Sequence, residues 1–228
     1  MPGLVLSLNV GHPEPNATKD VGRTGIGKLP VQSAVLRAPG PQHGGLGSGV
    51  DGDFIGDVAH HGGDHQAVYA YAREELDAWE ARLGRSLPSG MFGENLTTRG
   101  VDVDGALVGE RWAVGAEVML EVCGPRIPCS TFQARMSERG WVRRFSEVGN
   151  TGAYLSVLAG GTVRPGDRVE VVARPTHDIT VPVAFRAFMG DLDAARRVLA
   201  AGCLPDEEVV KLRGRLERRA SEPAELDA

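Results

Sequence analysis

Residues 117–132 read EVMLEVCGPRIPCSTF and combine a strand pattern with a cysteine set among prolines. Apolar residues occupy every second position from 118 to 122, a period of two that indicates a β-strand. The prolines at 125 and 128 exclude Cys129 from the middle of a helix or of a central strand. Arg126 lies three residues before Cys129, close enough to favour a thiolate. This thiol is a space filler, a nucleophile or a ligand for a soft metal.

Short apolar runs of the same kind extend from residue 4 to about residue 174. Residues 4–8 and 168–172 show the pattern clearly, and turns such as HPEPN (12–16) and RPGD (164–167) separate the runs. Many short strands joined by such turns predict a β-barrel or sandwich. Within this region the sequence predicts one helix over 67–83 and a second over 137–146, each with apolar residues on one face.

The pattern becomes helical after residue 180. Three short helices are predicted, from AFRAFMG (184–190), DLDAARRVLAAG (191–202) and PDEEVVKLRGRLERRA (205–220). Asp191 is a candidate N-cap, and Gly202 is a candidate stop. The fold class predicted is therefore mainly β with α. We divide the chain into a β domain at 1–180 and a helical segment with a frayed tail at 181–228.

Composition and charge narrow the class of protein. The 228 residues carry 42% hydrophobic and 24% charged side chains, which is ordinary for a soluble globular protein. The net charge of -5 argues against binding to nucleic acid or to an anionic membrane surface. The only cysteines are Cys123, Cys129 and Cys203, and they form no CxxC, which argues against a disulfide framework and predicts a cytoplasmic location. Cys123 is expected in the core and Cys203 to be inert.

Three other segments combine glycines with polar groups: TGIGKLPV (24–31), GDFIGDVAHHGGDHQAVYAY (52–71) and FGENLTTRG (92–100). Free N–H groups ahead of the helix expected from residue 67 would favour an anion there. Together the segments predict a cradle for an anionic ligand rich in heteroatoms. The candidate contacts are Lys28, His61, Gly62, Gly63, Asn95, Thr97 and Thr98.

The residues alone leave other interpretations open. Asp57, His60, His61 and His65 could form a zinc site, because positions 61 and 65 share a helical face. The glycines at 62 and 63 could simply start a helix, and the polar groups at 95–98 could only satisfy turn backbone.

Five segments in this order resemble the motifs of a MOSC domain, the module named for the C-terminal part of molybdenum cofactor sulfurase. They are TGIGKLPV, GDFIGDVAHHGGDHQAVYAY, FGENLTTRGVDV, GERWAVGAEVMLEVCGPRIPC and GNTGAYLSVLAGGTVRPGDRVEVV. The resemblance covers about residues 4–180. The remaining tail is similar to the three-helix segment of the bacterial subgroup that includes reductases of N-hydroxylated purine bases. The resemblance implies a MOSC-type β-barrel with one or two flanking helices and a small C-terminal helical segment.

The resemblance also implies a cofactor and a reaction. Cys129 matches the shared cysteine that ligates molybdenum in the cofactor-binding members, and Lys28, Arg126 and the turn at 61–63 are candidates for the phosphate of the molybdenum cofactor. Asn95, Thr97 and Thr98 would contact the pterin or the substrate. The reaction would be reduction of a small N-hydroxylated substrate with electrons from a separate reductase. His61 or Asp57 would deliver protons.

Other functions stay open beside this one. Cys129 could carry the cofactor, or a persulfide sulfur, to another enzyme, or it could be a buried structural thiol. Pyridoxal phosphate binding would need a Schiff-base lysine, for which Lys28 is the only candidate within the motif segments. Cys123 could form a disulfide with Cys129 on oxidation and block the site. The sequence does not indicate the physiological substrate or the oligomeric state.

Overall fold

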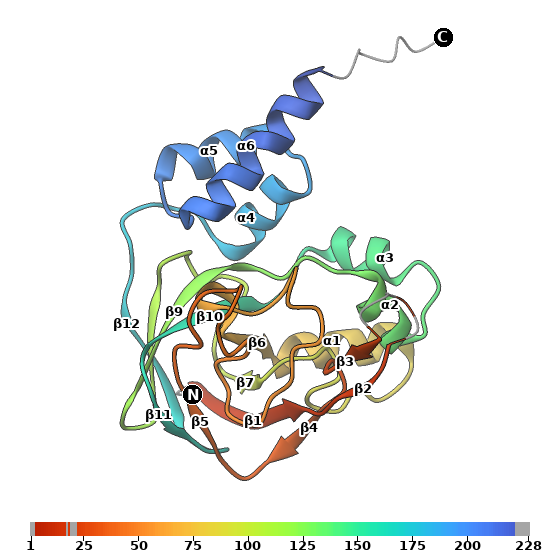
Figure 1. Cartoon of the computed structure of the whole chain (residues 1–228), viewed down its shortest axis with the longest axis vertical. Coiled ribbons are helices and arrows are strands. Elements are labelled where there is room, and N and C mark those ends of the chain that lie inside the picture. The colour runs from red at the N-terminus through yellow and green to blue at the C-terminus, as the bar shows by residue number, and fades with distance from the viewer. Residues whose placement is uncertain (1–2, 17, 19–21, 222–228) are drawn as a thin grey trace.

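The computed structural model describes residues 3–16, 18 and 22–221, and its centre is a closed barrel of seven strands (Figure 1). In the order in which they pair, the strands are β1 (Gly3–Gly11), β12 (Arg168–Ala173), β8 (Arg111–Val114), β9 (Val118–Pro125), β10 (Ala153–Ala159), β6 (Val68–Ala72) and β7 (Leu96–Arg99). The barrel closes because β7 pairs again with β1, and β6–β7 is its only parallel pair among these residues. The prediction of a mainly β fold with α is confirmed.

Shorter strands extend the barrel. β4 (Lys28–Val31) adds to the end of β1, β2 (Glu14–Pro15) pairs with β3 (Arg23–Thr24), and β5 (Ala34–Leu36) pairs with β11 (Gly161–Val163). The alternation read at 118–122 is confirmed, since Val118, Leu120 and Val122 all lie in the barrel core. Such burial of alternate residues is the main source of the barrel's stability, at roughly 1.5–3 kcal/mol for each large apolar side chain.

Three helices pack outside the barrel around an aromatic cluster (Figure 1). They are α1 (Arg73–Leu83), α2 (Ser130–Met136) and α3 (Trp141–Val148). Phe132 of α2 meets Trp141 and Phe145 of α3 edge to face, with ring centroids 5.4 and 5.1 Å apart. These contacts fix the first turn of α2, which directly follows Cys129.

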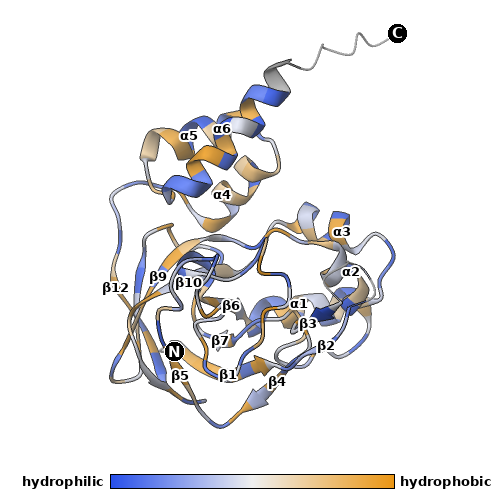
Figure 2. Ribbon diagram, viewed as in Figure 1, coloured by the Kyte–Doolittle hydropathy of each residue, from blue (hydrophilic) through white to orange (hydrophobic). Residues whose placement is uncertain are grey.

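The C-terminal helices α4 (Val181–Phe188), α5 (Leu192–Ala201) and α6 (Asp206–Ser221) pack together beside β9 (Figures 1 and 2). The predicted caps are confirmed: Asp191 accepts hydrogen bonds from the N–H groups at 193 and 194, and Gly202 ends α5 in the left-handed region. Val108 of the barrel belongs to the same apolar cluster as these helices. The domain boundary at residue 180 stays a prediction.

Two helix predictions were wrong in their bounds. Residues 68–72 (VYAYA) form strand β6, with all five side chains buried, and the helix begins only at Arg73. The helix expected over 137–146 begins at Trp141, because Ser137 already ends α2 with a φ of 54°. The expected tail beyond residue 221 lies outside the described residues. Within the part of the chain that the structure describes, no helix is long and apolar enough to cross a membrane.

Candidate functional site

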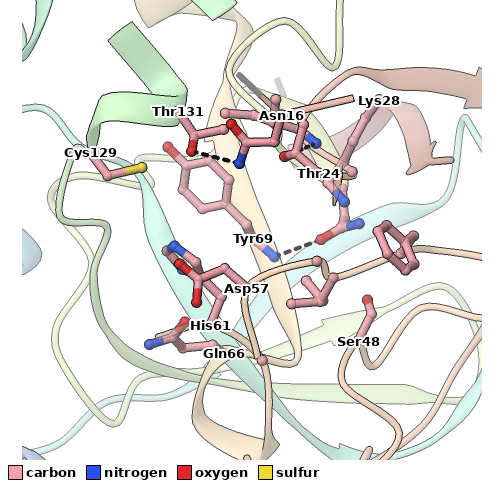
Figure 3. A pocket seen from close by; sticks show the side chains of 18 of the residues that line it. Asn16, Thr24, Lys28, Ser48, Asp57, His61, Gln66, Tyr69, Cys129 and Thr131 are labelled. Atoms are coloured by element: carbon pink, nitrogen blue, oxygen red, sulfur yellow. Dashed lines mark hydrogen bonds between the residues drawn. The ribbon is translucent and has the colours of Figure 1, made fainter. Parts of the chain in front are cut away.

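A pocket lies at the rim of the barrel, beside the loop that follows β9 (Figure 3). Its walls come from the glycine-rich segments near residues 24–28, 54–57 and 61–66, which are far apart in the sequence. The predicted site residues that the structure brings together here are Lys28, Asp57, His61, Gly62, Asn95, Arg126 and Cys129. Gly63, Thr97 and Thr98 do not line the pocket.

Cys129 is the N-cap residue of α2, and its sulfur points into the pocket (Figure 3). Burial raises the pKa of this thiol, but hydrogen bonding with the His61 side chain and the charge of Arg126 outweigh burial and lower the pKa to about 6. Burial raises the pKa of Cys123 to about 11. Among the three cysteines, Cys129 is therefore the thiolate at neutral pH.

Arg126 places a buried positive charge beside this thiolate, with only 6% of the residue exposed. Its guanidinium donates a hydrogen bond to the Phe92 carbonyl oxygen and lies 3.7 Å from the centroid of the Phe132 ring. In the described part of the chain, no carboxylate pairs with it. The negative charge next to Arg126 is the Cys129 thiolate, so the pocket presents a buried cation and a soft thiolate side by side.

Lys28 differs, because its charge is already neutralised. Its ammonium group pairs with the fully buried carboxylate of Asp53. That carboxylate also accepts hydrogen bonds from Ser48 Oγ at 2.8 Å and Asn95 Nδ2 at 3.0 Å. Asn95 Oδ1 accepts from the Tyr69 backbone N–H at 3.1 Å. The polar atoms of the Asn95 side chain therefore hold the pocket wall in place and are not left for a ligand. Lys28 does not favour a Schiff base, because its ammonium group is paired with Asp53.

Thr97 and Thr98 of β7 were predicted to contact a ligand, but neither lines the pocket. Thr97 Oγ1 donates to Glu94 Oε1 at 2.8 Å and accepts from Asn9 Nδ2 at 3.1 Å, so it is engaged inside the barrel wall. Thr98 is fully buried in the same strand. Period two sends neighbouring side chains to opposite faces of a strand, and neither of these faces is the pocket. Both threonines are placed away from any ligand in the pocket.

The turn at 61–63 also differs from its prediction. Gly63 precedes a single 3-10 turn, Asp64–Gln66, and then strand β6, so no α-helix dipole points at this turn. Gly62 does line the pocket, with a φ of 88° and the Gly47 carbonyl oxygen 2.8 Å from where a Cβ would sit. Only glycine fits that backbone.

Asp57 and the histidines do not form the alternative zinc site. The Asp57 carboxylate lies 2.9 Å from His60 Nδ1, whereas His61 lies beside Cys129. The described residues contain no cluster of three or more His, Cys, Asp or Glu side chains placed to hold a metal. Proton delivery by His61 or Asp57 stays a prediction.

Several pocket residues were not predicted from the sequence. Tyr69 is buried and Tyr154 half-buried in the wall, with ring centroids 5.3 Å apart, and Tyr69 Oη donates to the Thr151 carbonyl oxygen at 2.7 Å. Asn16 donates to Thr131 Oγ1 at 3.3 Å across the pocket rim (Figure 3). Tyr69 was not predicted to line a site because its segment was interpreted as a helix. Asn16 was not predicted because it lies in a segment interpreted only as a turn.

Comparisons with known proteins identify the relatives of this chain. Residues 57–170 match the family model described as MOSC domain. The uncharacterized protein YflK of Bacillus subtilis (strain 168) is 33% identical over 208 residues, 89% of each chain. A protein named Reductase from Gibberella moniliformis (strain M3125 / FGSC 7600) is 30% identical over 118 residues, which are 50% of this chain and 21% of that protein.

Solved structures show the same fold. The crystal structure of YiiM from Geobacillus stearothermophilus has a TM-score of 0.73 at 24% identity, covering 94% of this chain and 100% of that one. YiiM from Escherichia coli has a TM-score of 0.68 at 24% identity, covering 87% and 92%. The family match spans half of the chain, and YflK is similar over nearly its whole length. The chain belongs to the MOSC domain family.

Proposed function

We propose that this protein is an oxidoreductase that binds the molybdenum cofactor through Cys129 and reduces N-hydroxylated compounds. One observation carries the proposal: a thiol with a pKa of about 6 stands in a pocket beside a buried arginine that no described carboxylate neutralises. A soft thiolate suits molybdenum, and a buried cation suits an anionic group next to it.

The residues present fit such a cofactor. Cys129 would be the protein ligand to the metal, and Arg126 would face the negative charge of the phosphate or the dithiolene. Lys28 can contribute further N–H groups, since an ammonium has three and Asp53 takes one of them. Asn95 would act indirectly, by holding Asp53 and the backbone of Tyr69 in place. When bound, the cofactor would supply two-electron chemistry at the metal.

The chain's own groups would bind, orient and move protons. His61 hydrogen-bonds the Cys129 sulfur and is the nearest candidate to pass a proton to a departing oxygen. Asp57 is paired with His60, which leaves it as a second candidate one step away. Tyr69 and Tyr154 exclude water from the side of the pocket next to Arg126. The substrate would be a small molecule, and the electrons would come from a separate reductase.

Family membership supports the cofactor, and the fungal relative named Reductase supports reduction more weakly, since the chain spans only 21% of it. The N-hydroxylated substrate class rests on the resemblance of the whole chain, helices included, to the bacterial subgroup described above. No observation favours the carrier function over reduction.

The test is the molybdenum content per chain in protein from a host that makes the cofactor. We expect about one molybdenum per chain in the wild type and a loss of it in Cys129→Ser. Cys123→Ser is the matched control, because Cys123 is a nearby thiol outside this pocket, and it should keep its metal. Metal-loaded protein should then reduce an N-hydroxylated base with reduced methyl viologen as donor. Metal-free wild type, or metal retained in Cys129→Ser, would overturn the proposal.

A further inference from the structure

A separate cleft lies where the start of α1 meets the loop after β7 and the start of α4. Its volume is about 590 Å³, which is enough for a small organic molecule or a long side chain. It shares no residue with the pocket at Cys129. A ligand in this cleft would therefore bind to groups that the proposed function does not use.

Four carboxylates line the cleft, and no lysine, arginine or histidine among the described residues does. They belong to Glu74, Glu75, Asp102 and Asp104, and we refer to the hollow that they line as the acidic cleft. Within the part of the chain that the structure describes, none of the four takes part in an ion pair. Because like charges gathered in one hollow repel each other, a cation would stabilise this arrangement.

Backbone groups hold three of these carboxylates in place. One oxygen of Glu74, one of Asp102 and one of Asp104 each accept a hydrogen bond from a backbone N–H, at 2.8, 2.8 and 3.0 Å. The second oxygen of each accepts no hydrogen bond from the residues that the structure describes. The acceptors are therefore oriented before any ligand binds, which lowers the entropy cost of binding.

Asp104 is the member whose surroundings call for a ligand. Only 8% of the residue is exposed, and its Oδ2 is buried without a hydrogen-bond partner. Burial, together with the negative charges of Glu75 and Asp102, raises the pKa of this carboxyl to about 7 despite hydrogen bonds from the backbone. The other titratable groups around it are Glu74 of α1 and Tyr71 of β6. A buried oxygen without a donor destabilises the ionised carboxylate, and a cation in the cleft would remove that cost.

The remaining lining narrows the kind of cation. Apolar side chains border the carboxylates, from Ala72, Val101, Val103 and Pro182. An aliphatic stem can pack on such groups while its charged end meets the carboxylates. The described residues contain no cluster placed to hold a metal ion, so the cation would be organic. A guanidinium has five N–H donors in one plane and can reach several fixed carboxylates at once, whereas an ammonium is a compact point charge.

We propose that the acidic cleft binds a guanidinium group on an aliphatic stem, with buried Asp104 and the more exposed Glu75 and Asp102 as its acceptors. The group would belong to a free guanidine compound or to an arginine side chain of another protein, since both present the same chemistry. The inference goes beyond the proposed function and does not rest on it, because the two sites share no residue.

Calorimetry on the full chain tests the proposal with ligands of equal charge. Butylguanidine is the probe, and butylamine is its control, because it carries an ammonium on the same stem. An alanine–arginine–alanine peptide with blocked ends distinguishes the sources: tighter binding of the peptide than of butylguanidine indicates a protein side chain, and weaker binding indicates a free compound. Asp104→Asn removes the buried charge and keeps an oxygen for the Gly152 N–H. Asp51→Asn removes an exposed charge outside the cleft and is the control variant.

We expect butylguanidine to bind the wild type at pH 8 with a Kd of about 1 mM or lower, and butylamine to bind more weakly. Asp104→Asn should weaken binding by about tenfold or more, and Asp51→Asn should leave it unchanged. The cation binds the ionised form of Asp104, so the wild-type Kd should fall by about tenfold from pH 6 to pH 8, and Asp104→Asn should lose this dependence. No binding to the wild type, equal binding of the two ligands, equal behaviour of the two variants, or a Kd that does not change with pH would contradict the inference.

Discussion

Cofactor-free protein should show a Cys129 thiol that titrates near neutrality. We predict that the reaction of Cys129 with a dipyridyl disulfide follows a single ionisation with a midpoint near pH 6, the pKa that results when His61 and Arg126 outweigh burial. The rate should rise with pH up to about one unit above that midpoint and then stay level. Absorbance of the released thiopyridone gives the rate, and peptide mass spectrometry identifies the residue that has reacted.

The midpoint of the pH profile is the quantity to measure, because the reaction rate at a single pH differs little between Cys129 and an ordinary thiol. At pH 7 a thiol of pKa about 6 is roughly 90% ionised, and one of pKa about 9 is roughly 1% ionised. A thiolate loses nucleophilicity as its pKa falls, by roughly 20-fold over three units at a Brønsted slope of about 0.45. The two effects leave Cys129 only about fourfold faster than an ordinary thiol.

Two substitutions locate the cause of the shift. Arg126→Met removes the charge and keeps an apolar side chain under the Phe132 ring, so the midpoint should rise by roughly one unit or more. His61→Asn removes the imidazole and should act in the same direction. Arg111→Met removes an exposed arginine on β8 that is paired with Glu121, and it should leave the midpoint unchanged. A wild-type midpoint above about pH 8, or no rise in Arg126→Met, would refute this account of the thiolate.

Three further predictions concern the scaffold. Glu94→Gln should lower the free energy of unfolding by about 1–3 kcal/mol in urea, because the buried carboxylate accepts bonds at both oxygens and an amide nitrogen cannot. Gly25→Ala should unfold at clearly lower urea than Gly214→Ala, because its Cβ would meet the Phe54 carbonyl oxygen at 2.0 Å, whereas a Cβ at position 214 of α6 would meet the end of the Arg218 side chain at 3.5 Å, an ordinary contact. Burial raises the pKa of Asp104 to about 7, so this residue costs stability as pH rises from about 4 to 7; Asp104→Asn should therefore gain up to about 4 kcal/mol at pH 8 and nothing at pH 4.

The fold was predictable wherever a strand has one buried face. Residues 118–122 alternate between core and rim, so their period was visible in the sequence. Residues 68–72 are buried on both faces of their strand, so they do not alternate between apolar and polar side chains. Without that alternation, their apolar residues looked like the beginning of the helix that starts at Arg73. The short helix α2 was missed because its seven residues are too few to show a period, and contacts with the aromatic cluster stabilise it.

The site was predictable only in part, because its contacts form when the barrel closes. Arg126 and Cys129 are three residues apart and flanked by prolines, so the sequence alone predicted that the arginine would favour the thiolate. Lys28 was identified as a cation, but nothing local showed that Asp53 would neutralise it across 25 residues. Thr97 looked available for the same reason, since its partners Asn9 and Glu94 are revealed only by strand pairing.

The two buried cations of the pocket explain why it suits an anion. Both have 6% of their surface exposed, yet Lys28 has the Asp53 carboxylate as its partner, whereas Arg126 contacts the Phe92 carbonyl oxygen, the Phe132 ring, the ring and hydroxyl of Tyr69, and the Cys129 thiolate. A metal bound to Cys129 would take up the charge of that thiolate and leave the arginine without a counter-charge, which costs several kcal/mol for a buried group. A bound anion would offset this cost and stabilise the folded chain by RT ln(1 + [L]/Kd), where [L] is the free ligand concentration. Arg126 therefore links the stability of the chain to the ligand that the pocket is shaped to hold.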